Sequence, residues 1–239
     1  MKWLLGYLAG LCVLTLIVCE AIALPTFSKA FYSHEFDKYG VPETISVEKN
    51  ELMRVTSEML DYMRGRRGDL NVPSVVAGQE REFFNQREKD HMVDVYKLFE
   101  IGFRVRNIAF WSLLFLILLM VFLKIRVSFI LARCCREIVA GFLILSAILA
   151  GIIAIDFDRA FTVFHLIFFS NDLWQLNPAT DLLVNIVPIG FFTDIAIFIG
   201  ALFLVFSAVI IIIATVCIRK MSAVERYPDA AVSRRRRLK

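Results

Sequence analysis

Three histidines are the candidate acid–base side chains of this chain: His34, His91 and His165. An imidazole titrates near neutral pH, so each of them can accept or donate a proton under physiological conditions. His34-Glu35 begins like the zinc-protease pattern H-E-x-x-H, but Lys38 occupies the position of the second histidine. The metal interpretation fails there, and His34 is expected in an exposed loop.

His165 has the most apolar surroundings of the three, in residues 161–169. An ionisable side chain at such a place costs on the order of a few kcal/mol unless it is paired. Burial would lower the pKa of the imidazole, which keeps the ring neutral and able to act as a base. The alternative is a structural histidine bonded to a backbone carbonyl, and both interpretations stay open.

His91 lies in a charged segment, residues 87–94, that reads as helical. On a helix, Asp94 follows about one turn later and could hold the imidazole in one tautomer. The alternative is a surface histidine on a charged helix. The topology predicted below places His91 and His165 at the same membrane boundary, where two imidazoles can serve as a base and an acid.

A polar cluster, Ser170-Asn171-Asp172-x-Trp174, follows the apolar window of His165. The Asn171 amide and the Trp174 indole N–H are donors that could face a developing oxyanion, and Asp172 could orient a histidine. The alternative is the end of a helix followed by an interfacial aromatic anchor.

Four long apolar runs must position these side chains in a chain that is 58% hydrophobic and contains 22 phenylalanines. The predicted membrane-spanning helices are residues 3–24, 107–123, 138–155 and 195–218, each about as long as a bilayer requires. Residues 21–23 resemble a signal-peptidase site, but the first run is longer than the core of a signal peptide. We therefore expect it to be retained.

The segments between the spans predict an all-α membrane protein. Residues 25–106 are polar, with amphipathic patterns over residues 47–62 and 80–100, and predict a small, mainly helical cap. Residues 156–194 are rich in aromatic side chains but broken by Asn, Asp and Pro, which indicates an interfacial or re-entrant segment.

The placement of basic residues predicts the orientation. Lys2, the loop of residues 124–137 and the tail of residues 219–239 are basic, which places both termini in the cytoplasm and the cap outside. The run Arg234–Arg237 could suggest nucleic acid, but a basic tail beside a span is more typical of the cytoplasmic face, so no nucleic-acid partner is expected. The five cysteines show no metal-binding spacing.

Two long stretches of the sequence resemble the Lit family, the bacterial lipoprotein intramolecular transacylases. The first reads Glu80-x-Glu82-Phe83-Phe84-Asn85-x-Arg87-Glu88-Lys89-x-His91-Met92-x-Asp94-Val95. The second reads Phe164-His165-x-Ile167-Phe168-Phe169-x-Asn171-Asp172-x-Trp174-x-Leu176-x-Pro178. The four-span layout with an outer segment after the first span is similar as well, so the resemblance covers most of the chain.

The resemblance implies a reaction in the plasma membrane of a bacterium, with membrane lipids around the enzyme. The substrate would be a lipoprotein with a diacylglyceryl-modified N-terminal cysteine, whose sn-2 acyl chain moves to the free α-amino group. His91 and His165 match the catalytic histidines, and no cofactor or metal is implied. The matched positions expected to bind or orient substrate are Phe84, Arg87, Asp94, Phe168, Asn171, Asp172 and Trp174.

The chemistry agrees with the residues, because two imidazoles can deprotonate the amine and protonate the leaving glyceryl oxygen. Our hypothesis from the sequence is that His91 is the base and His165 the acid. Two alternatives stay open: a metal-dependent membrane hydrolase that uses both histidines with Asp94 or Asp172, and a membrane sensor or accessory protein with a ligand-binding cap.

Overall fold

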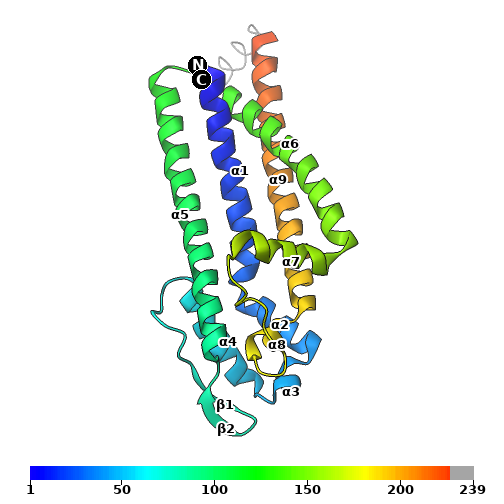
Figure 1. Cartoon of the computed structure of the whole chain (residues 1–239). Coiled ribbons are helices and arrows are strands. Elements are labelled where there is room, and N and C mark those ends of the chain that lie inside the picture. The colour runs from blue at the N-terminus through cyan, green and yellow to red at the C-terminus, as the bar shows by residue number, and fades with distance from the viewer. Residues whose placement is uncertain (227–239) are drawn as a thin grey trace, which may run out of the picture. The chain divides into compact units, whose positions relative to one another are not determined.

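The computed structural model describes residues 1–226, with side chains described through residue 222. The run Arg234–Arg237 lies outside the described residues. The helices and strands follow one another along the chain as labelled in Figure 1: α1 (Lys2–Thr26), α2 (Lys29–Tyr39), α3 (Val41–Ile45), α4 (Lys49–Met63), β1 (Pro73–Val76), β2 (Gln79–Glu82), α5 (Gln86–Phe122), α6 (Val127–Ile155), α7 (Phe157–Phe168), α8 (Leu182–Ile186) and α9 (Ile189–Arg226).

Four helices are long and apolar enough to cross a membrane: α1, α5, α6 and α9. The most apolar part of each has a mean hydropathy between 2.2 and 3.1, and this confirms a helical membrane protein with four spans. Three helices begin well before the predicted spans: α5 at Gln86, α6 at Val127 and α9 at Ile189, so most of the loop predicted over residues 124–137 belongs to α6. The expected cap helix and the second span form one 37-residue helix, α5, because no proline interrupts residues 86–122.

The chain divides into two compact units, and α1, α5, α6 and α9 each contribute residues to both. The first unit contains Met1–Ala21, Val105–Leu149 and the described residues from Ala201 onward. There, α6 approaches α1 at a glycine: a Cβ added to Gly6 would lie 2.5 Å from Ile130 Cγ2 and 2.8 Å from Cys134 Sγ. Small residues commonly permit such close contacts between membrane helices.

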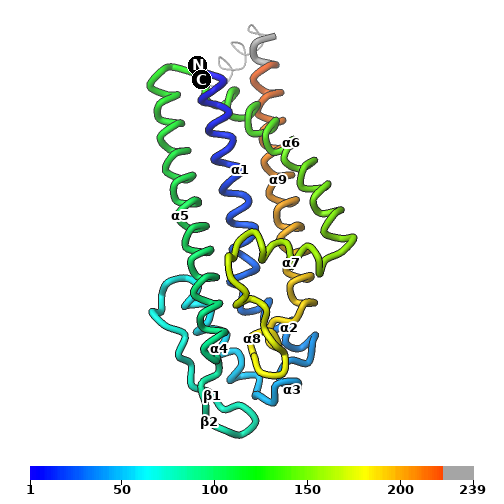
Figure 2. The backbone as a smooth tube through the Cα atoms, viewed as in Figure 1, coloured from blue at the N-terminus to red at the C-terminus, as the bar shows by residue number. Residues whose placement is uncertain are grey.

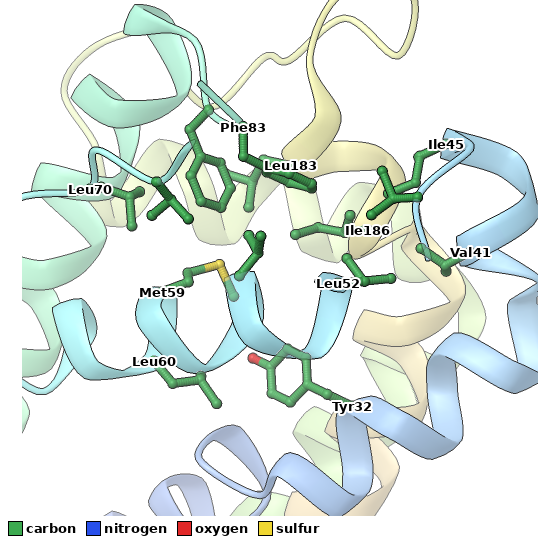
Figure 3. Close-up of a cluster of buried hydrophobic side chains, with 14 of the residues drawn as sticks. Tyr32, Val41, Ile45, Leu52, Met59, Leu60, Leu70, Phe83, Leu183 and Ile186 are labelled. Carbon is green, nitrogen blue, oxygen red and sulfur yellow. The ribbon is translucent and has the colours of Figure 1, made fainter. Parts of the chain in front are cut away.

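The second unit contains Ile22–Arg104 and Ala150–Gly200 and has its own apolar core (Figure 3). The stripe Leu52, Val55 and Met59 of α4 has helical spacing and is buried. It packs in one cluster with Phe83 and with Ile186 of α8, which is fully buried. This core joins segments that are far apart in the sequence, and all the residues of the candidate site belong to this unit.

A β-hairpin in the second unit was not predicted from the sequence. Strands β1 and β2 pair antiparallel, with Pro73 opposite Glu82. Ala77 and Gly78 have φ values of 51° and 77° at the turn between the strands. The helix expected over residues 80–100 is therefore wrong at its start: residues 80–82 are in β2, and α5 begins at Gln86. His34 is exposed as expected but lies on α2, not in a loop.

The aromatic segment of residues 156–194 folds as α7, a loop, α8 and the first turns of α9 (Figure 2). We call residues 169–181 the outer loop, because the sequence predicts that this segment lies on the outer side of the membrane. Helix α7 begins where the Asp156 side chain accepts a hydrogen bond from the Arg159 backbone N–H at 3.0 Å. Its apolar side chains are largely exposed, and His165 is its one buried residue.

Candidate active site

The structure places two of the three histidines beside each other. The ring centroids of His91 on α5 and His165 on α7 are 6.3 Å apart, with an angle of 34° between the ring planes. Each residue is only 7% exposed. The sequence separates them by more than seventy residues, so the pair exists only because α7 packs against the beginning of α5 within the second unit.

The N-terminus of α5 positions His91 through a reciprocal pair of hydrogen bonds. The Glu88 backbone N–H donates to Asn85 Oδ1 at 3.0 Å, and the Asn85 backbone N–H donates to Glu88 Oε2 at 2.6 Å. This arrangement is a capping box, which satisfies N–H groups at the start of a helix. The cap fixes where α5 begins, and His91 follows in the second turn.

The backbone of α7 determines the tautomer of His165. Its Nδ1 lies 2.7 Å from the carbonyl oxygen of Phe161, one turn earlier on the helix. A carbonyl oxygen only accepts hydrogen bonds, so Nδ1 must carry the proton, and the neutral ring has a free lone pair on Nε2. Burial lowers the pKa of His165, and the bond to Phe161 opposes this by stabilising the protonated form.

His91 is held differently. It lies on the charged part of α5, before the apolar stretch that begins near residue 107. Its Nδ1 is buried and has no hydrogen-bond partner among the described residues. Burial, reinforced by the neighbouring His165, lowers the pKa of His91 to about 4, while Asp94 raises it by a smaller amount. His91 is therefore neutral at pH 7, and no hydrogen bond from the described residues decides whether its Nδ1 carries the proton.

Aromatic rings enclose the two imidazoles. Phe169 contacts both, with centroid distances of 5.4 Å to His91 and 5.5 Å to His165. Trp174 stacks on His165 at 4.8 Å, and Phe161 lies 4.2 Å from the same ring. These contacts explain the desolvation of the histidines and give the site apolar walls.

Two hydrogen bonds link α5 to the outer loop on either side of His91. Asp94 Oδ2 accepts from Asn171 Nδ2 at 2.7 Å, and Arg87 Nη2 donates to the backbone carbonyl of Asp172 at 2.6 Å. The Trp174 indole N–H donates to the Asn171 carbonyl at 3.0 Å. The Trp174 indole N–H and one N–H of the Asn171 amide are thus used within the protein, where they position the outer loop, and the oxyanion role stays a prediction.

The two predicted phenylalanine positions differ. Phe84 is fully buried in the core of the second unit and packs on Phe83 at 4.9 Å, so it has no exposed surface that substrate could contact. Phe168 is 52% exposed on α7 and packs on Phe164 at 4.7 Å. Its exposure is compatible with contact to an acyl chain.

Sequence reasoning missed two buried carboxylates next to the site, Glu88 and Asp181. The spacing Asn85-x-x-Glu88 is a recognisable capping signal and could have indicated Glu88. Asp181 had no comparable signal. Across residues 1–222, no group of three or more His, Cys, Asp or Glu side chains has a geometry that could hold a metal ion.

Four helical spans in one chain with a desolvated histidine pair define a class of membrane-integral proteins able to perform acid–base chemistry. Residues 7–192 match the family model described as lipoprotein intramolecular transacylase Lit. The match covers most of the chain, which therefore belongs to the Lit family and is an acyltransferase of lipoproteins.

Solved structures show the same fold. The lipoprotein intramolecular transacylase Lit of Bacillus cereus aligns with a TM-score of 0.75 at 20% identity, covering 93% of this chain and 98% of the other. A histidine-to-arginine variant of the same Bacillus cereus protein aligns with a TM-score of 0.73, also at 20% identity, over 93% and 94% of the two chains. A comparison with curated protein sequences gave no match.

Proposed function

We propose that this enzyme moves the sn-2 acyl chain of a diacylglyceryl-modified cysteine to the α-amino group of the same cysteine. The product is a lyso-form lipoprotein that carries an amide-linked acyl chain. The observation that carries the proposal is the pair of neutral, buried imidazoles at 6.3 Å, because one can remove a proton from the amine while the other supplies a proton to the leaving oxygen.

The tautomer of His165 supports a definite division of the roles. With Nδ1–H bound to the Phe161 carbonyl, Nε2 of His165 is available to accept the proton of the attacking amine. The same carbonyl stabilises the imidazolium that results. His91 then donates its proton to the glyceryl oxygen as the ester C–O bond breaks, and the His165 imidazolium passes the proton taken from the amine to the neighbouring His91, so that both rings end neutral. This assignment reverses the hypothesis drawn from the sequence, in which His91 was the base.

Because the reaction is intramolecular, the main role of the protein is to orient the amine and the ester of the substrate. Amine and ester belong to one substrate molecule, so no covalent acyl-enzyme, metal ion or diffusible acyl donor is needed. Well-oriented reactants can gain about 7–11 kcal/mol relative to free ones. Phe169 and Trp174 beside the histidines are suited to exclude water, which would otherwise hydrolyse the ester.

We also propose that the site lies on the outer face of the bacterial plasma membrane, where the cap meets the lipid, with both termini in the cytoplasm. The basic residues between Lys124 and Arg136, at the beginning of α6, and the basic residues after Arg219 support this orientation. The exposed apolar side chains of α7, among them Leu166 and Ile167, are suited to contact with lipid.

The test is mass spectrometry of the N-terminal peptide of one diacylglyceryl lipoprotein after incubation with the purified enzyme. Wild-type protein and a His34→Ala control, altered at an exposed histidine, should give the N-acylated lyso-form. His91→Ala and His165→Ala should leave the diacylglyceryl peptide with its free amine. Full conversion by His165→Ala would refute the mechanism. Loss of activity with a chelator would favour the hydrolase alternative, and activity of both variants in vivo would favour the sensor.

A further inference from the structure

Glu88 is a buried carboxylate that the proposed reaction does not use. It is 1% exposed, and each of its oxygens accepts a backbone hydrogen bond from a different segment. Oε2 accepts from the Asn85 N–H at 2.6 Å, and Oε1 accepts from the Leu183 N–H at 2.5 Å. The carboxylate therefore joins the first turn of α5 to the beginning of α8, ninety-five residues later.

Asp181 completes the connection from the other side. It is 3% exposed; its Oδ1 accepts from Asn85 Nδ2 at 2.8 Å, and its Oδ2 accepts from the Asn177 N–H at 2.7 Å. We call Asn85, Glu88 and Asp181 the clasp. Within the described residues, the carboxyl groups of Glu88 and Asp181 accept hydrogen bonds from amide N–H groups rather than from a cationic side chain. This arrangement requires both carboxyl groups to act as acceptors.

The clasp holds the end of the outer loop, while the α5 residue Asp94 holds its beginning through Asn171. The loop carries Phe169 and Trp174, the rings that contact the histidines. On the α5 side, His91 follows Glu88 by one helical turn. The same hydrogen bonds thus fix the position of one histidine and of the rings that cover both.

An N-terminal cap alone would not need a buried charge. Burial raises the pKa of Glu88, and the hydrogen bonds from the Leu183 and Asn85 backbone oppose this effect. Asp181 raises the pKa of Glu88 further, and Arg81 lowers it. A desolvated carboxylate is costly when it loses even one partner, so moving the beginning of α8 away from Glu88, and the end of the outer loop with it, is strongly disfavoured.

We propose that the clasp keeps the outer loop closed over the histidine pair, and thereby makes the α-amine, not water, the group that attacks the ester. Glu88, Asn85 and Asp181 are positioning residues in this account, which rests on the proposed transacylase function. If water attacked, its oxygen would bond to the ester carbonyl carbon as the glyceryl C–O bond breaks. The products would be a free fatty acid and a lyso-lipoprotein with an unmodified amine.

The first test is Glu88→Gln, which preserves the shape of the side chain but replaces one acceptor oxygen with a donor amide. The full-length protein in lipid nanodiscs is incubated with a diacylglyceryl lipopeptide, and N-acylated lyso-peptide, free-amine lyso-peptide and free fatty acid are quantified. We expect transfer to fall about ten-fold, as for the loss of one charge-assisted hydrogen bond. The hydrolysed share of the product should rise.

The matched control is Asp90→Asn. Asp90 is an exposed acid on the same helix, and it accepts a hydrogen bond only from its neighbour Gln86, at 2.8 Å. Asp90→Asn removes the same charge two residues from Glu88 without touching the outer loop. Its rate and product ratio should equal those of the wild type.

A second pair of variants separates positioning from folding. Asn85→Asp keeps the cap acceptor for the Glu88 N–H but places a new carboxylate opposite that of Asp181, so it should raise hydrolysis. The double variant Asn85→Asp with Asp181→Asn reverses donor and acceptor and should restore the product ratio in part. Contacting residues also couple in stability, so the Tm of each variant is measured alongside the products. A product ratio that changes and is rescued while the Tm stays near that of the wild type indicates positioning, because a merely structural role would move the Tm with it.

The outcomes are distinguishable. If wild-type protein makes no N-acylated lyso-peptide, the proposed function itself fails. If wild-type protein is active and Glu88→Gln matches it in rate and product ratio, the clasp proposal is overturned. It is also overturned if Glu88→Gln lowers both products equally together with the Tm, and the double variant rescues nothing.

Discussion

The two histidines of the site are held by different kinds of structure. His91 lies on α5, whose first turns are joined to the outer loop by the hydrogen bonds of Arg87 and Asp94 and to α8 by a hydrogen bond that Glu88 accepts. His165 lies on α7, whose other side chains are largely exposed, and it is held by the Phe161 carbonyl and by stacked rings.

This difference suggests that the two histidines have different roles in proton transfer. The helix backbone itself selects the tautomer of His165, so its Nε2 is ready as an acceptor before substrate binds. The protein leaves Nδ1 of His91 without a partner among the described residues, so bound substrate can decide which nitrogen of His91 carries the proton. In the mechanism that we propose, a prearranged base therefore faces an adaptable acid.

The largest expected effect is on His165. His165→Ala should lower the transfer rate by about 10²–10⁴-fold, the range typical of a lost general base. Because the substitution leaves a space beside Trp174, added imidazole should restore part of the rate in this variant. Initial rates with and without imidazole provide the measurement. If imidazole rescued His91→Ala but never His165→Ala, the assignment of His165 as the prearranged base would be wrong.

A smaller effect is expected from the link between α5 and the outer loop. Asn171→Asp would place a carboxylate against Asp94 and should lower the rate about ten-fold, through the loss of a hydrogen bond and the new repulsion. The double variant Asp94→Asn with Asn171→Asp exchanges the donor and the acceptor and should recover much of the lost rate. Gln175→Glu makes the same chemical change at an exposed position of the outer loop and should leave the rate unchanged. Equal rates for all three proteins would show that this link has no part in catalysis.

The sequence predicts the four spans and the burial of His165 because their signals are local. A run of about twenty apolar residues indicates a span, and a histidine among phenylalanines indicates burial. The hairpin escaped prediction because β2 reads Gln-Glu-Arg-Glu and lacks the alternation that marks a half-buried strand. The clasp and the tautomer of His165 depend on contacts that only the folded chain creates, such as the bond from Leu183 to Glu88.

The smallest expected effect is on the pH dependence of the transfer rate, which tests whether the aromatic rings around both histidines keep them neutral. Burial lowers the pKa of both histidines, that of His91 to about 4, so they stay neutral below the ordinary value of about 6.5. Transfer should therefore persist as the pH falls through 6.5, and its acidic limb should lie in the window below that value. The unfolded chain binds more protons than the folded chain in this window, so the free energy of unfolding should also decrease as the pH is lowered.

Phe169→Ala sharpens this prediction, because Phe169 covers both rings. Admitting water to the imidazoles should move the acidic limb of the rate profile upward by about one pH unit, toward the value of a free histidine. Ile167→Ala, at a position of α7 that is 70% exposed, should leave the limb in place. Rates between pH 4 and 8 decide the matter: an acidic limb near 6.5 in the wild type would mean that the aromatic cover does not keep the histidines neutral.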